Sequence, residues 1–156
     1  MIKIEIENAE NISRLLGKVA EKTQNRQDLM ADLAETMRLA VDKNFEMEGR
    51  PDWQGLAHPN KSGKILQGKS RDLRLKIITK SDNSEAIVGS NKVYAAIHQF
   101  GGKAGRNKRA EIPKRPFLTL TEEDKEDLLD DVQDYFQRLI SQWTVRNGKF
   151  HNTRPN

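Results

Sequence analysis

The chain has 156 residues, which is about the length of one ordinary domain. It contains no cysteine, and this excludes disulfides, thiolate metal ligands and cysteine nucleophiles. No apolar run approaches the ~20 residues of a membrane span, and the alternating N-terminus is unlike a signal peptide, so we expect a cytoplasmic protein without a membrane partner. Hydrophobic residues make up 35% of the chain, which predicts a small core with extended loops.

The net charge of +4 is unevenly distributed along the chain. Residues 1–60 carry 8 basic and 11 acidic side chains, residues 61–120 carry 14 and 4, and residues 121–156 carry 5 and 8. The net charges of the three segments are therefore −3, +10 and −3. A basic middle between acidic ends is typical of a nucleic-acid surface, of complementary faces between subunits, or of a solvated lysine-rich surface.

The N-terminal part reads as one strand followed by two helices. Residues 2–7 alternate isoleucine with charged side chains, which predicts a strand. Helical spacing of apolar residues predicts a short helix over 10–22 and a second helix over 27–47, which Gly49 and Pro51 end. The apolar face of the second helix comprises Leu29, Met30, Leu33, Ala34, Met37, Ala40, Val41 and Phe45.

The middle of the chain alternates loops with short elements. Residues 49–72 are rich in glycine and proline and predict an extended mobile loop, anchored on the core by Trp53 and Leu56. Residues 73–80 and 85–90 predict two strands, and the polar residues between them a hairpin turn.

Residues 93–100 predict a short helix that Gly101 ends, and residues 101–115 combine six basic side chains with three glycines. That composition predicts a second mobile loop. A long helix is predicted over 122–143, with Thr121 as its N-cap and acidic residues in its first turn. The fold class is therefore α+β: one domain over 1–143, in which helices pack a small antiparallel sheet, and a flexible tail over 144–156.

Three sequence features resemble catalytic or ligand-binding sites, but the residues around each of them argue against such a site. Residues 63–70 match the phosphate-loop pattern G-x-x-x-x-G-K-S, but no apolar strand precedes them and the segment after them is β-rich. A nucleotide hydrolase acting through Lys69 and Ser70 is therefore the weakest interpretation. The histidines at 58, 98 and 151 lack metal-ligand spacing, and His98 is interpreted as a structural residue with its hydrogen bonds satisfied. The eight carboxylates in 122–134 fit a solvated helix face, so we expect no enzyme, no metal and no cofactor.

The basic loop is the strongest candidate for binding a partner. Its cations could neutralise phosphates, but no aromatic residues are interleaved for base stacking, so contact with an acidic surface of another subunit is favoured over DNA. A helix like 122–134 would provide such a surface. The predicted partner-binding residues are Lys103, Arg106, Lys108, Arg109, Lys114 and Arg115.

Several blocks together resemble a known family. They are the passage from Phe45 to Leu56, the segment Ile65–Leu73, Val88 to Gly102 with its Tyr-Ala-Ala-Ile-His-Gln-Phe-Gly-Gly sequence, and Ile112 to Leu118 with its Arg-Pro-Phe-Leu sequence. Over roughly residues 10–140 they resemble the virion morphogenesis, or tail completion, proteins of tailed phages and prophages. One departure is Gln67, where the family usually has threonine.

The resemblance implies a structural protein that completes the tail or neck so that heads can join, in the bacterial cytoplasm during assembly and then in the virion. It also implies partners among the tail and neck proteins and a ring of copies, commonly a hexamer. DNA binding through 103–115 is the alternative. The positions expected to define the fold are Trp53, Tyr94, Phe100, Gly101, Pro116, Phe117 and Leu118.

Overall fold

The computed structural model describes residues 25–58, 62–68 and 70–147. The strand predicted at 2–7 and the helix predicted at 10–22 lie outside the described residues. The elements in chain order are α2 (Gln27–Glu46), α3 (Asp72–Leu75), β1 (Ile77–Ser81), β2 (Ala86–Ser90), α4 (Ala95–Phe100), β3 (Gly102–Ala104), the 3-10 turn η1 (Arg106–Lys108), β4 (Ala110–Ile112) and α5 (Glu122–Asn147). Helices combined with two two-stranded antiparallel sheets confirm the α+β class.

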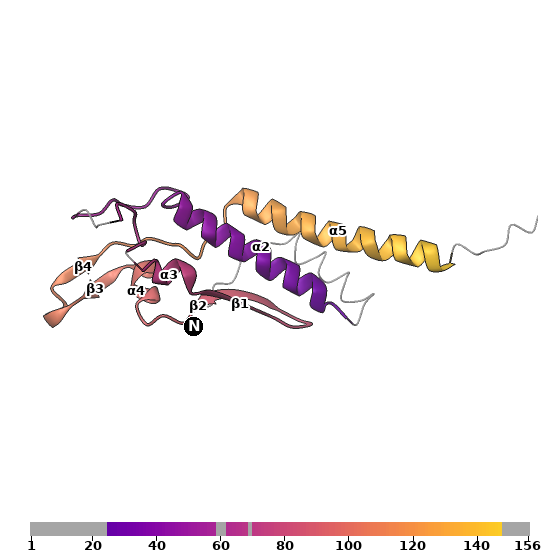
Figure 1. Ribbon diagram of the computed structural model, residues 1–156, viewed down its shortest axis with the longest axis horizontal. Coiled ribbons are helices and arrows are strands. Elements are labelled where there is room, and N and C mark those ends of the chain that lie inside the picture. Colours follow the sequence, from indigo (N-terminus) through magenta and orange to yellow (C-terminus); the bar gives the residue numbers. More distant parts are fainter. Residues whose placement is uncertain (1–24, 59–61, 69, 148–156) are drawn as a thin grey trace, which may run out of the picture.

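The two long helices form the body of the molecule. Helix α2 lies between α5 on one side and the β1–β2 hairpin on the other (Figure 1). The helices run antiparallel, because Thr36 of α2 contacts Asp131 of α5 while Asp32, one turn earlier, contacts Arg138 further along. Their shared core comprises Leu29, Met30, Leu33, Leu128, Val132 and Tyr135.

The predicted apolar face of α2 is confirmed. All of its members are buried except Met37, which is half-buried and packs against the same core. The helix ends where predicted, since the Gly49 N–H donates to the Asn44 carbonyl at 2.8 Å. Gly49 has a φ of +109°, and a Cβ there would lie 2.6 Å from Trp53. Glycine is therefore required at this turn.

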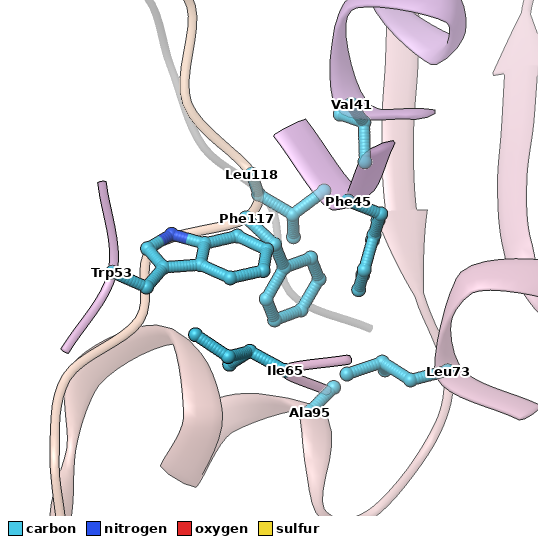
Figure 2. Packing of buried hydrophobic residues seen from close by; sticks show 8 residues of the cluster. All are labelled: Val41, Phe45, Trp53, Ile65, Leu73, Ala95, Phe117 and Leu118. Atoms are coloured by element: carbon cyan, nitrogen blue, oxygen red, sulfur yellow. The ribbon is translucent and has the colours of Figure 1, made fainter. Parts of the chain in front are cut away.

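A second core lies where the chain leaves α2, and Figure 2 shows its side chains. The Phe45 ring meets the Trp53 ring edge-on at 5.7 Å and the tilted Phe117 ring at 5.4 Å. Trp53 is buried and Leu56 packs half-buried against the cluster, as predicted for the anchors of the 49–72 loop. The remaining buried members are Val41, Ile65, Leu73, Ala95 and Leu118.

The strand predicted from residue 73 starts later, at Ile77. Residues 72–75 form α3 instead, because Leu73 is buried in the core and the Arg74 guanidinium is drawn onto Asp42 of α2 at 2.6 and 2.8 Å. From Ile77 onward the hairpin is as predicted, with antiparallel pairing from Ile77↔Ser90 to Ser81↔Ala86. Asp82 closes the turn by accepting hydrogen bonds from the backbone N–H groups of residues 84 and 85.

The segment 101–115, predicted as an irregular loop, contains a second hairpin. Strands β3 and β4 pair antiparallel from Gly102↔Ile112 to Ala104↔Ala110, and η1 connects them. The segment is therefore structured, while its mobility stays a prediction. Helix α5 begins as predicted, since Thr121 Oγ1 accepts from the Asp124 N–H and Asp124 Oδ2 accepts from the Thr121 N–H. It continues to Asn147, four residues past its predicted end.

Candidate interaction surface

The two most specific blocks of the resemblance contact each other. Residues 115–118 cross the core without regular secondary structure, so their backbone groups need side-chain partners. Gln99 of α4 supplies them: its Oε1 accepts from the Phe117 and Leu118 N–H groups at 3.0 and 2.9 Å, and its Nε2 donates to the Leu118 carbonyl at 3.4 Å. The Arg115 N–H donates to the His98 carbonyl at 2.8 Å. The contacting residues of both blocks therefore have a structural role, because they hold each other in place.

Two further side chains bind the same segment from the α2 side. Asn44 Nδ2 donates to the carbonyls of Phe117 and Thr119 at 2.8 and 2.9 Å. Trp53 Nε1 donates to the Pro116 carbonyl at 3.1 Å. We call residues 115–118 together with Asn44, Trp53 and Gln99 the frame. Its polar groups are satisfied inside the core, so it fixes the position of the β3–β4 hairpin that precedes it.

Arg115 belongs to the frame, which corrects its assignment as a partner-binding residue. Its side chain is 6% exposed, and its Nε and Nη2 donate to the carbonyls of Gln54 and Gly55 at 2.8 and 2.9 Å. The guanidinium therefore holds the 49–72 loop against residue 115. Burial lowers the pKa of Arg115 from its ordinary value.

The residues expected to define the fold differ in what they do. Phe117, Leu118 and Trp53 are buried, and the Pro116 carbonyl is bound by Trp53. Tyr94 is partly exposed, and its hydroxyl donates to Asp72 Oδ2 at 2.6 Å, which ties α4 to the start of α3. Phe100 is 62% exposed because α4 turns that side chain away from the core, so it is not a core position.

Gly101 supports the base of the hairpin through its backbone. It has a φ of +72°, and a Cβ there would lie 2.9 Å from the Lys114 nitrogen and 3.1 Å from the Ile112 carbonyl oxygen. The chain leaving α4 and the chain leaving β4 therefore approach each other more closely than a side chain permits. Gly101 therefore allows the close approach of the two chain segments at the base of the hairpin.

The five other predicted partner-binding residues gather on the hairpin. All five are exposed, and none forms an ion pair with a residue in the described ranges. We call this surface the basic hairpin. Its residues are Lys103, Arg106, Lys108, Arg109 and Lys114. Glu111, opposite Lys103 in the β3–β4 register, is the one carboxylate on the hairpin, so the hairpin keeps an excess of positive charge that attracts an anionic surface.

The carboxylates of α5 divide into two groups. Asp124 is buried, and Arg50 binds both of its oxygens at 2.9 and 2.8 Å. Burial raises the pKa of Asp124, but hydrogen bonds from Arg50 and Thr121 outweigh that effect and hold it below its ordinary value. The second group is exposed and, within the described part of the chain, forms no ion pair. We call it the acidic stripe; its residues are Glu126, Asp127, Asp130 and Asp134.

Residues 63–70, which match the phosphate-loop sequence pattern, have surroundings unlike those of a phosphate-binding loop. The Ile65 N–H, which a phosphate would need, donates to the Glu48 carboxylate at 2.6 Å. Gln67 is buried, donates to the Phe45 carbonyl at 2.6 Å and accepts from Arg74 at 3.0 Å. The helix that follows has only four residues. Lys69 lies outside the described residues. The described part of this segment therefore serves as packing between α2 and α3.

His98 differs from its predicted role. Burial and the nearby Arg115 cation lower its pKa. Its Nδ1 is buried without a hydrogen-bond partner among the described residues, so the prediction that its hydrogen bonds are satisfied is wrong. It lines a hollow of about 290 Å³ beside Tyr94 and Asp72. Asp72 is already bound by Lys92 at 2.7 Å and by Tyr94. His151 lies outside the described residues.

No group of three or more histidine or carboxylate side chains in the described ranges is arranged to hold a metal ion. No helix there is both long and apolar enough to cross a membrane.

No role is predicted from the sequence for two residues that hold the frame, Asn44 and Gln99. The backbone groups that they bind in the frame are 18 to 75 residues away in the sequence. A polar residue on the apolar side of a helix was the available signal, and Asn44 beside Val41 and Phe45 carries it.

The comparisons with known proteins agree with the resemblance. The sequence model of the phage virion morphogenesis family matches residues 7–137. The Mu-like prophage FluMu G protein 2 of Haemophilus influenzae is 50% identical over 144 residues, which cover 90% of this chain and 99% of the relative. A protein of Escherichia phage Mu named "Putative capsid assembly protein G" is 29% identical over 115 residues, covering 65% of this chain and 73% of the relative. No solved structure matches. The chain belongs to the phage virion morphogenesis family.

Proposed function

We propose that this chain is a non-enzymatic structural protein that completes the tail or neck of a phage or prophage particle, so that head and tail join. Membership of a virion morphogenesis family and a relative named for capsid assembly support a role in building the particle. Assembly then takes place in the host cytoplasm, and the protein acts at the tail or neck through contacts with other virion proteins and with copies of itself.

One observation carries this proposal. Gln99 and Arg115, which belong to the two specific sequence blocks, make their side-chain hydrogen bonds to the backbone of the same chain. What they support is an exposed hairpin with five cations that form no ion pair within the part of the chain that the structure describes. A rigid frame that presents a charged surface is the design of a docking protein.

The proposal is tested by reversing two charges of the basic hairpin. Arg106→Glu/Arg109→Glu changes exposed side chains at positions without a left-handed backbone, so folding should be retained. The matched control, Lys76→Glu/Lys80→Glu, makes the same charge change at exposed positions on and next to β1. Each variant replaces the gene in a phage or prophage that encodes this chain, and electron microscopy counts joined particles after induction.

We expect the hairpin variant to leave separate heads and tails, while the control yields joined particles. If the hairpin variant produces joined particles at the control level, the basic hairpin has no part in joining and its assignment is wrong. If deletion of the whole gene leaves joining intact, the proposed function itself fails.

A nucleic-acid-binding protein is the second candidate, and the unpaired cations are the observation that favours it. Five phosphate contacts would make log K fall with log salt at a slope of about −4 to −5. No aromatic residue lies between Lys103 and Arg115 to stack on bases. A gel shift with duplex DNA at low and physiological salt decides: absence of salt-sensitive binding excludes this candidate.

A further inference from the structure

We propose that the basic hairpin of one copy docks on the acidic stripe of the next copy, so that subunits associate head to tail. The inference rests on the proposed function and names a partner for the same surface. It follows from four observations: the number of unpaired charges, their placement, the size of the two surfaces, and an exposed aromatic side chain beside the hairpin.

The charges on the two surfaces complement each other. The hairpin presents five exposed cations and the stripe four exposed carboxylates, and neither set is neutralised within the described part of the chain. Other exposed carboxylates of α5 are occupied, since Glu122 pairs with Lys125 at 2.8 Å and Glu123 lies 3.6 Å from Lys43. The basic hairpin and the acidic stripe are therefore two clusters of opposite sign whose members form no ion pair within the described residues, although single exposed charges such as Lys76 and Lys80 lie elsewhere.

The two patches cannot satisfy each other within one chain. The basic hairpin lies at one end of the long axis of the molecule, and α5 runs from the middle toward the other end (Figure 1). A contact between them must join different copies. Reciprocal pairing of the two patches would close a twofold dimer, whereas the head-to-tail arrangement proposed here joins each copy to the next and, repeated around a closed rotation, produces a ring.

The two surfaces also match in size. At 1.5 Å per residue, the stripe from Glu126 to Asp134 is about 12 Å long. At 100° per residue its four side chains fall within about 100° of one another around the helix. Strands of three residues, such as β3 and β4, are about 10 Å long. A hairpin of this length can lie along the stripe with its cations facing carboxylates.

An exposed aromatic side chain borders the hairpin. Phe100, at the end of α4, is 62% exposed, and Gly101 joins it directly to β3. Exposed ion pairs alone contribute little to an interface, whereas desolvated aromatic side chains contribute much. Phe100 would therefore supply the part of the contact that salt does not weaken.

Cysteine cross-linking tests the contact, because the natural chain has no cysteine. The variant Ala110→Cys/Gln133→Cys places one thiol on the hairpin and one beside the stripe, both at exposed positions. The control Ala110→Cys/Thr79→Cys moves the second thiol to an exposed position on β1, on the other side of α2. Both are oxidised at low and at high salt, and the products are separated without reductant.

We expect the first variant to form a ladder of dimers, trimers and larger covalent species, at least fivefold above the control and reduced at high salt. Adding Arg106→Glu/Arg109→Glu should abolish the ladder, and adding Asp130→Lys/Asp134→Lys as well should restore it. A ladder no stronger than the control overturns the proposal, and so does a ladder unaffected by charge reversal.

These results separate the inference from the proposed function. If no ladder forms but Arg106→Glu/Arg109→Glu still blocks joining of heads and tails, the hairpin binds a different virion protein and only the inference fails. If the ladder forms while joining never depends on the gene, the inference stands and the proposed function fails.

Discussion

At the scale of single residues, one ion pair determines how α2 meets α5. Arg50 donates to Asp124 from Nη1 and Nη2. It also donates from Nε to Asn44 Oδ1 at 2.7 Å and from Nη2 to the Ala40 carbonyl at 2.8 Å. Both charged side chains are almost fully buried, at 9% and 4% exposure. The sequence predicted Asp124 only as a first-turn carboxylate, because nothing local connects it to a residue 74 positions away.

We predict that Asp124→Asn lowers the free energy of unfolding by about 3–5 kcal/mol, because it leaves the Arg50 cation buried without a counter-charge. The loss of charge also weakens the cap at Thr121. Urea denaturation at neutral pH measures the change. Asp130→Asn, an exposed carboxylate on the same helix without a described partner, is the control and should change stability by less than about 0.5 kcal/mol. Equal effects of the two substitutions would contradict a structural role for the pair.

Asp131 has the opposite behaviour. Burial raises its pKa, and repulsion from Asp32, Asp134 and Asp127 adds to this, while the hydrogen bond from Thr36 at 2.5 Å partly offsets it. A carboxyl whose pKa is raised by folding destabilises the native state above that pKa. This destabilisation disappears as the pH falls toward about 3.9, the pKa of an aspartate side chain in the unfolded chain.

We therefore predict that Asp131→Asn increases stability at pH 7 by up to about 1 kcal/mol, since the amide oxygen can still accept from Thr36. The gain should shrink as the pH falls toward the unfolded pKa, because the raised pKa of the wild-type carboxyl lets it take up its proton before the unfolded chain does. Urea midpoints across this pH range measure it. A gain that persists unchanged at acid pH would show that charge is not its cause.

At the scale of elements, the sequence predicts the helices and strands that have a regular spacing of apolar residues. It does not predict the elements that depend on contacts with residues far away in the sequence. Both long helices and the β1–β2 hairpin follow from their apolar spacing and turn residues. The α3 turn was missed because Leu-Arg-Leu at 73–75 alternates like a strand, whereas a core position and Asp42 draw the chain into a helix. The β3–β4 hairpin was missed because its three-residue strands contain glycine, alanine and lysine, which have low strand propensity.

The position of the basic hairpin depends on Gly101, which two matched substitutions test. Gly101 and Gly105 have nearly equal φ, at +72° and +77°, so alanine strains the backbone similarly at both. At Gly101 the new Cβ also meets the Lys114 backbone at 2.9 Å, whereas at Gly105 the nearest atom is 3.8 Å away.

We predict that Gly105→Ala costs about 1–3 kcal/mol, because φ near +75° with ψ near 180° is a region that essentially only glycine adopts. Gly101→Ala should cost at least about 1 kcal/mol more, because the backbone atoms that its Cβ would meet cannot move aside as a side chain can. Thermal or urea unfolding measures both variants. Equal destabilisation would mean that the base of the hairpin tolerates a wider spacing than the structure shows.

At the scale of the whole molecule, the charge pattern read from the sequence becomes a spatial one. The +10 segment contains the hairpin at one end of the molecule, and the acidic C-terminal segment begins with α5, which extends toward the other. Of the six cations that the sequence predicted as candidate contacts, five are exposed on the hairpin. Arg115 was assigned wrongly, because it donates to two carbonyls about 60 residues away in the sequence, and local composition cannot predict such a contact.

This separation of charge predicts how association responds to salt. Raising the salt concentration from about 50 mM to about 500 mM shortens the screening length from over 10 Å to about 4 Å, so attraction between exposed patches weakens strongly. We expect the association constant measured by sedimentation to fall at least about tenfold. Phe100→Ser should lower it further at both salt concentrations without changing the ratio, because its contact is apolar. Association that strengthens with salt would instead indicate an apolar interface and would remove the charged patches from it.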